Sequence, residues 1–135
     1  MTDTQRDPYF IDFPKRMHDI QAEMANQGID VYLGSRLRTL SWTLDAFCPW
    51  RSFVVIPREG LPTAFTFVID AARVADESWL DADHVLGYAP MGGQDQITAI
   101  SDFIGQYLYN GQGVVGVESG MSSYLPEGNL THYEY

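Results

Sequence analysis

Hydrophobic positions between residues 53 and 69 form two apolar runs, and these runs predict the centre of a β-sheet. Phe53–Ile56 and Ala64–Ile69 are rich in β-branched and aromatic residues, and the polar turn Arg58-Glu59-Gly60 separates them. Short apolar runs of this composition, bounded by proline and glycine, are typical of strands rather than helices. Because consecutive positions are apolar in both runs, we expect helices to cover both faces of the sheet.

A second pattern predicts an amphipathic helix near the N-terminus, because apolar residues recur there at spacings that alternate between three and four. Asp12 is the expected N-cap, Pro14 falls in the first turn, where proline is tolerated, and Gly28 is expected to end the helix. The apolar positions are Phe10, Phe13, Met17, Ile20 and Met24.

The remaining patterns alternate between strands and helices. Further strands are expected at Ile29–Leu33, Thr39–Thr43, His84–Tyr88 and Val114–Glu118. Helices are expected at Asp70–Ser78, where Asp70 is able to act as the cap, and at Gln94–Tyr109, while Ser119–Leu125 could begin another. This alternation predicts an α/β layer fold.

Composition narrows the class of protein. The chain has 135 residues, enough for one domain, and 45% of them are hydrophobic. Its net charge of −10, from 8 basic and 18 acidic residues, argues against nucleic-acid binding, since phosphate contacts need clustered Lys and Arg. The sequence has no apolar run long enough to cross a membrane and lacks the pattern of a signal peptide. With a single cysteine and no disulfide framework, a cytoplasmic location is expected.

Three short motifs suggest chemistry, and each has a simpler interpretation. Gly111–Gly116 matches G-x-G-x-x-G, but a helix precedes it and a strand follows, the reverse of a dinucleotide site, so an ordinary turn is predicted. Asp81, Asp83 and His84 are explained equally well by a solvated turn before a strand. Cys48 has no base positioned by the sequence, so a buried structural cysteine is predicted. No catalytic residue and no metal site are predicted in this chain.

The segment just before the central strand carries the most informative cluster, which consists of Trp42, Phe47, Pro49, Trp50 and Arg51. An arginine is a ready partner for a carboxylate, and aromatic faces can hold a cation. The same residues could equally pack on the sheet edge or form an oligomer contact. The sequence leaves these interpretations open.

Several stretches then match one pattern in order and spacing: Met24-x-x-x-Gly28-Ile29-Asp30, Arg38–Trp42, Arg51, Val54–Pro62, Asp70, Ala72 and Gly116–Glu118. Together they resemble the N-terminal domain of the creatinase / prolidase / aminopeptidase P family, the pita-bread metallohydrolases. The resemblance covers about residues 12–125, with residues 1–11 as a loose N-terminal segment. The N-x-x-Y-L-T-G motif usual in that family is degraded here to Arg38–Asp45, which lacks both the asparagine and the glycine.

The resemblance implies a mixed β-sheet of about five to six strands with helices on both sides, in the ribonuclease-H-like arrangement. It also implies that residues 12–135 form a non-catalytic dimerisation and lid domain, truncated before a catalytic domain that binds divalent metal. In such a homodimer Arg51, with Trp50 and Phe47, would contact the small-molecule or peptide substrate of the partner subunit. No cofactor is implied in the present domain.

Two alternatives remain open. The chain could be a freestanding dimerisation or small-ligand-binding module without catalysis, with the aromatic cluster before the central strand as its binding or contact surface. A flavodoxin-like nucleotide binder is the third interpretation, although no phosphate loop follows a strand. The substrate of a parent enzyme is not determined by these residues.

Overall fold

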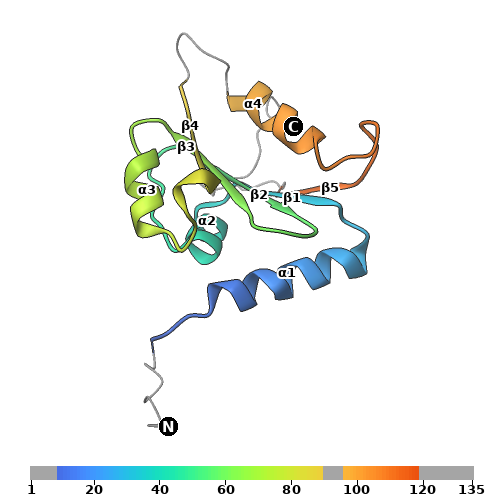
Figure 1. Ribbon diagram of the computed structural model, residues 1–135, viewed down its shortest axis with the longest axis horizontal. Helices are drawn as coiled ribbons and strands as arrows, with labels where there is room; N and C mark the ends of the chain where they lie inside the picture. The colour runs from blue at the N-terminus through green and yellow to red at the C-terminus, as the bar shows by residue number, and fades with distance from the viewer. Residues whose placement is uncertain (1–8, 90–95, 119–135) are drawn as a thin grey trace, which may run out of the picture.

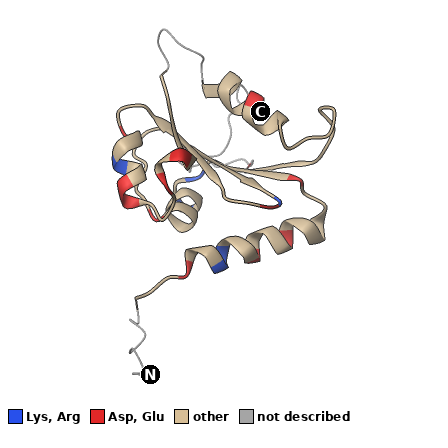
Figure 2. Cartoon of the chain, in the orientation of Figure 1, with Lys and Arg blue, Asp and Glu red and all other residues tan. Residues whose placement is uncertain are grey.

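The computed structural model describes residues 9–89 and 96–118. Its centre is a five-stranded mixed sheet with the order β4-β3-β2-β1-β5 (Figure 1). The five described strands carry no charged residue, and the charges lie on helices and connections (Figure 2). The strands are β1 (Val31–Gly34), β2 (Phe53–Pro57), β3 (Thr63–Phe67), β4 (Val85–Tyr88) and β5 (Val115–Val117).

The directions of the strands bring most of their carboxyl ends to one edge of the sheet. β1 is antiparallel to β2, and β2 is antiparallel to β3. β4 runs parallel to β3, and β5 runs parallel to β1. The carboxyl ends of four strands therefore meet the start of β2 along a single edge, which we call the carboxyl edge.

Helices cover both faces of the sheet, as the consecutive apolar runs predicted (Figure 1). One face packs against α1 (Phe13–Gln27), α2 (Leu37–Leu44) and α3 (Ala71–Glu77). The opposite face packs against α4 (Gln96–Gly105). A short 3₁₀ helix, η1 (Ala82–His84), precedes β4. None of the helices within the described residues is long and apolar enough to cross a membrane.

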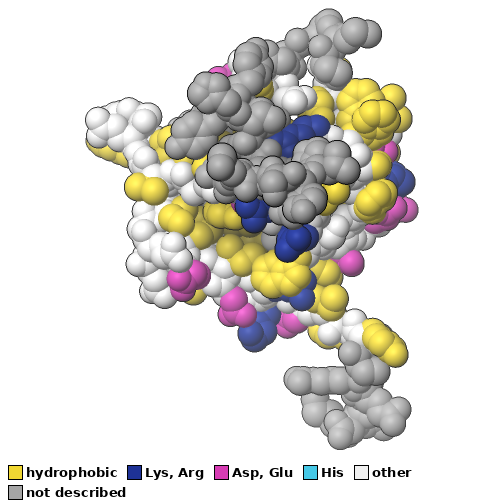
Figure 3. All heavy atoms as spheres, turned by 180° about the vertical axis from the view of Figure 1, so that it is seen from behind, with side chains coloured by type: hydrophobic (Ala, Val, Ile, Leu, Met, Phe, Trp, Pro, Cys, Tyr) yellow, Lys and Arg dark blue, Asp and Glu magenta, His cyan; other side chains and the backbone are white. Residues whose placement is uncertain are grey.

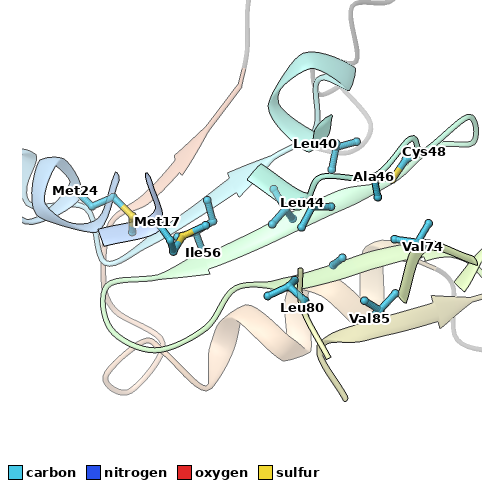
Figure 4. Packing of buried hydrophobic residues seen from close by; sticks show 12 residues of the cluster. Met17, Met24, Leu40, Leu44, Ala46, Cys48, Ile56, Val74, Leu80 and Val85 are labelled. Atoms are coloured by element: carbon cyan, nitrogen blue, oxygen red, sulfur yellow. The ribbon is translucent and has the colours of Figure 1, made fainter. Parts of the chain in front are cut away.

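The central strand β2 divides its side chains between two hydrophobic cores. Val54 and Ile56 belong to the core that also holds Leu40, Leu44 and Val74, part of which is drawn in Figure 4. The next positions along the strand, Phe53 and Val55, belong to the core beneath α4. Alternate residues of a strand point to opposite faces, so a strand buried on both sides must be apolar throughout.

The N-terminal helix confirms the predicted capping pattern. The backbone N–H of Lys15 donates to Asp12 Oδ1 at 2.9 Å, and proline occupies the first turn. Gly28 ends the helix at φ 70°, and its N–H bonds back to the last turn. Gln21 then ties the helix to the β2–β3 turn, donating from Nε2 to the carbonyl oxygens of Pro57 at 3.0 Å and Gly60 at 2.8 Å.

The strand predicted at Thr39–Thr43 is wrong, because this segment lies within helix α2. Its partial alternation of apolar residues is also compatible with a helix, in which Leu40, Thr43 and Leu44 form the buried face while Leu37 and Trp42 stay about half exposed. Tertiary burial of that face against the sheet favours the helix.

Other differences are smaller. The helix predicted at Gln94–Tyr109 is described only over Gln96–Gly105, and a turn follows it. Asp70 precedes α3, but its side chain makes no capping hydrogen bond and instead pairs with Arg73 at 3.4 Å. The helix suggested at Ser119–Leu125 lies outside the described residues.

Replacement of Leu44, a fully buried side chain at the centre of Figure 4, tests this packing. Leu44→Ala should lower the free energy of unfolding by about 2–5 kcal/mol, because it removes buried methyl groups and leaves a cavity. Urea denaturation measures the effect. Ile69→Ala, at a side chain that is 75% exposed, is the control and should change stability by less than about 0.5 kcal/mol. Equal effects would contradict the assigned core.

Candidate functional site at the carboxyl edge

Residues 45–52, which form the aromatic loop, lie at the carboxyl edge because they connect α2 to the start of β2. Tyr88, the last residue of β4, donates a hydrogen bond from its hydroxyl to the carbonyl oxygen of Arg51. Ser52 Oγ donates to the carbonyl oxygen of Trp50 at 2.9 Å. The loop is therefore held to the sheet by its backbone, which leaves side chains to project from it.

Arg51 lies across the edge toward the end of β1. Its Nη1 donates to the carbonyl oxygen of Ser35 at 3.5 Å, and its guanidinium carbon lies 4.9 Å from the centre of the Phe53 ring. A guanidinium over an aromatic face is favoured electrostatically. These contacts hold the cation of Arg51, a partly exposed residue, at the carboxyl edge of the sheet.

Trp50 begins a short chain of aromatic rings along the same edge. Its ring centre lies 5.7 Å from that of Phe67, which in turn lies 6.1 Å from that of Tyr88. Trp50 nevertheless remains 59% exposed, so the edge that carries the cation of Arg51 also carries a large exposed aromatic surface. This combination can bind an anionic or amphipathic group, or an aromatic side chain of a partner.

Phe47 lies apart from this pair, toward α3. Arg73 Nη2 donates to the carbonyl oxygen of Phe47 at 2.9 Å, and the N–H of Phe47 donates to Glu77 at 3.4 Å. The Phe47 ring is 63% exposed. The structure therefore places Trp50 at the end of β3, Arg51 toward the end of β1 and Phe47 at the flank of the loop.

Glu118 is a buried carboxylate that the sequence analysis did not single out as functional. Its Oε2 accepts from the backbone N–H groups of Ser35 and Arg36, each at 2.7 Å. Its Oε1 accepts from Tyr32 Oη at 3.0 Å and from the hydroxyl of Thr39. One side chain at the end of β5 thus fixes the connection from β1 to α2, and the only sequence signal is an acid at the end of a short apolar strand.

This anchor also positions Arg51, through Ser35. The N–H of Ser35 is held by Glu118, while its carbonyl oxygen accepts from Arg51. Ser35 is buried, and its Oγ has no hydrogen-bond partner within residues 9–89 and 96–118. Buried polar atoms in folded proteins are nearly always partnered, so Ser35 Oγ indicates a further polar group at this edge.

The other predicted motifs have structural roles. The Gly111–Gly116 motif joins the end of the α4 region to β5, so the helix-to-strand turn is confirmed. Asp81 caps η1, and its Oδ1 lies 2.7 Å from His84 Nδ1, a contact that lowers the pKa of Asp81. Cys48 is buried at 2% exposure, and burial raises the pKa of its thiol. Among the described residues, no group of three or more His, Cys, Asp or Glu side chains could hold a metal ion.

A cavity of about 470 Å³ lies between α1 and α2. Figure 3 shows hydrophobic side chains gathered on this face, with charged side chains around them. The floor of the cavity includes Tyr32 and Ile56, and its walls include Met24 and Trp42. No residue of the aromatic loop lines it.

Comparison with known proteins identifies the class of fold. The structure has the fold of the creatinase/prolidase N-terminal domain, which confirms the fold that the sequence resemblance implied. It is similar to that domain of an X-Pro dipeptidase from Streptococcus pyogenes, with a TM-score of 0.55 and 16% identity. The alignment covers 65% of this chain and 66% of that one, slightly less than two thirds.

Two further structures show the same fold. A proline dipeptidase from Streptococcus pneumoniae aligns with a TM-score of 0.57 and 15% identity, over 67% of this chain and 66% of that chain. A prolidase from Thermococcus sibiricus aligns with a TM-score of 0.61 and 13% identity, over 74% of this chain but only 27% of the prolidase. No family model and no curated protein matches the sequence.

Loss of the Glu118 carboxylate should destabilise the fold. Glu118→Ala should lower the free energy of unfolding by about 3 kcal/mol or more, because it leaves buried donors without their charged acceptor. Glu118→Gln should lower the free energy of unfolding by less, since the amide oxygen of glutamine still accepts hydrogen bonds. Glu59→Ala, in the exposed β2–β3 turn, is the matched control. If urea denaturation gives Glu118→Ala and Glu59→Ala the same free energy of unfolding, the anchoring role of Glu118 is disproved.

Tyr32 should make stability fall at high pH. Burial raises the pKa of Tyr32, and the adjacent Glu118 charge raises it further. The unfolded chain therefore loses this proton first, at about pH 10, so the contribution of Tyr32 is complete below that pH and declines above it. Tyr32→Phe should give a shallower fall in urea midpoint between about pH 9.5 and 11. An identical pH dependence in both proteins would contradict the expectation.

Proposed function

We propose that this chain is the N-terminal, non-catalytic domain of a metal-dependent hydrolase of the creatinase / Xaa-Pro peptidase type, which dimerises and closes over the partner subunit's active site. The single observation that supports this most is that one loop presents an exposed Trp50 and a partly exposed Arg51 at the carboxyl edge of a fold that is shared with X-Pro dipeptidases. Binding sites in open α/β sheets lie outside the carboxyl ends of strands.

In this proposal Arg51 recognises a carboxylate or another polar group of the substrate, and Trp50 covers its apolar part. Phe47, which lies toward α3, would extend the contact to the flank of the loop. The guanidinium is suited to this role because it presents a planar set of donors and keeps its charge.

The chemistry itself would reside in another domain of the parent enzyme. There a divalent metal would activate water for cleavage of an X-Pro peptide bond or of a C–N bond in a small substrate. The residues of the present chain would bind and orient the substrate and exclude water. We place the enzyme in the cytoplasm, in keeping with the single, buried cysteine of the present chain.

A freestanding dimerisation or ligand-binding module is the second candidate, favoured by the 470 Å³ apolar cavity, which lies within the size range of small-molecule sites. An immunoblot of the native polypeptide in its own cell separates the two. A band much heavier than 15.2 kDa supports the hydrolase domain. A band at 15.2 kDa supports the freestanding module and overturns the hydrolase proposal.

Substitutions at the carboxyl edge of the full-length enzyme test the substrate contact. Arg51→Ala should lower kcat/KM about tenfold to a hundredfold, the range expected when a hydrogen bond to a charged group is lost. Trp50→Ala should act in the same direction, Phe47→Ala more weakly, and Arg51→Lys should restore only part of the activity. Tyr109→Ala, at a side chain that is 84% exposed and precedes β5 at the opposite edge of the sheet, is the control. Unchanged kinetics for Arg51→Ala in an intact dimer would refute the contact.

A further inference from the structure

The cavity of about 470 Å³ between α1 and α2, which we call the α1–α2 cavity, has one acidic and one basic side chain in a mainly apolar lining. Glu23 belongs to the α1 wall and Arg38 to the α2 wall. Figure 3 shows both acidic and basic side chains around the hydrophobic surface of this face. In small-molecule sites, a few such polar groups fix the orientation of a ligand whose body contacts apolar walls.

The two charged side chains belong to opposite ends of the cavity. Gln27 and Ile29, which line the cavity near Glu23 in the sequence, lead into β1, whereas Arg38 follows the end of β1. A strand rises about 3.3 Å per residue, so the four residues of β1 separate these ends by about 13 Å. A ligand that meets both charges must therefore be elongated and must carry its own charges at its two ends.

Both side chains are charged at neutral pH. Glu23 Oε1 accepts from Gln27 Nε2 at 2.8 Å, and its Oε2 accepts from Asn26 Nδ2 at 3.5 Å. These hydrogen bonds lower the pKa of Glu23 and hold its carboxylate on the α1 wall. Arg38 makes contacts within the chain, but a guanidinium has five donors and can bind a ligand carboxylate in addition.

The hydroxyl groups in the lining donate to acceptors of the protein itself. Tyr32 Oη and the Thr39 hydroxyl donate to Glu118, and Thr43 Oγ1 donates to the carbonyl oxygen of Thr39 at 2.7 Å. An amide carbonyl in the middle of a ligand would lose water here without gaining these donors, which costs free energy. The middle of the ligand should therefore be a hydrocarbon. An apolar cavity of about 150 Å³ accommodates benzene in an engineered lysozyme, so a chain of similar carbon content fits here.

We propose that the α1–α2 cavity binds a linear ω-amino acid, a molecule with an ammonium group at one end of a hydrocarbon chain and a carboxylate at the other. The ammonium group pairs with Glu23, the carboxylate pairs with Arg38, and the chain lies on the floor that includes Ile56. None of residues 45–52 lines this cavity, so the inference goes beyond the substrate contact of the proposed function and does not depend on it.

An NMR titration of the 135-residue chain with ε-aminocaproate tests the ligand class. Norleucine is an isomer of this molecule with the same two charges, but its charges are adjacent and cannot reach both ends of the cavity. Its Kd should be about fivefold higher or more, and so should those of hexylamine and hexanoate, which each lack one charge. Absence of any shift with ε-aminocaproate, or an equal Kd for norleucine, would overturn the proposal.

Variants of the two charged residues test the direction of the ligand. Glu23→Gln should raise the Kd of ε-aminocaproate about twofold to fivefold, the range for an exposed ion pair, and leave that of hexanoate unchanged. Arg38→Gln should have a similar effect on ε-aminocaproate and leave the Kd of hexylamine unchanged. Asp19→Asn, on the same helix but outside the lining, is the matched control for Glu23→Gln. If neither Glu23→Gln nor Arg38→Gln differs from Asp19→Asn, the two ion pairs are refuted.

The same titration locates the ligand. The backbone amide signals of Tyr32 and Thr39 should shift, whereas those of Trp50 and Arg51 should not. Arg51→Ala should keep the wild-type Kd for ε-aminocaproate. A higher Kd in Arg51→Ala would place the ligand at the aromatic loop and overturn the inference. The kinetics of Arg51 variants in the full-length enzyme test only the proposed function, so failure of one proposal is distinguishable from failure of the other.

Discussion

Burial of β2 on both faces is the constraint from which the rest of the domain follows. Val54, Val55 and Ile56 have no exposed surface, so helices must cover both sides of the sheet. Close packing on both faces favours apolar side chains along the strands and leaves polar chemistry to the connections. The domain can therefore place cations and exposed aromatic rings only at the strand ends or on the outer helix surfaces.

The topology of the sheet determines which residues lie at the carboxyl edge. β2 begins where the other strands end, so the loop before it crosses the ends of β1, β3 and β4. Backbone contacts hold this loop, and the Glu118 carboxylate fixes Ser35 beside Arg51. A rigid frame beneath exposed side chains reduces the entropy lost when a ligand binds. That property suits either substrate contact in a hydrolase or recognition by a freestanding module.

The two candidate surfaces of the molecule serve different purposes. The aromatic loop combines a cation with an exposed indole, which favours a polar or anionic ligand. The α1–α2 cavity is mainly apolar, which favours an apolar group. None of residues 45–52 lines this cavity, so the two surfaces use different side chains.

The sequence by itself determined the elements whose local pattern and burial agree. The apolar periodicity, the Asp12 cap and the Gly28 stop defined α1. Continuous apolar runs defined the buried hairpin of β2 and β3. Only the tertiary structure decided that residues 39–43 are helical. Their apolar residues alternate only in part, and this pattern is compatible with a strand or a helix until one face is buried. It also decided that Glu118 meets Ser35 and that Phe47 turns toward α3. Such contacts join residues distant in the chain, and no local pattern encodes them.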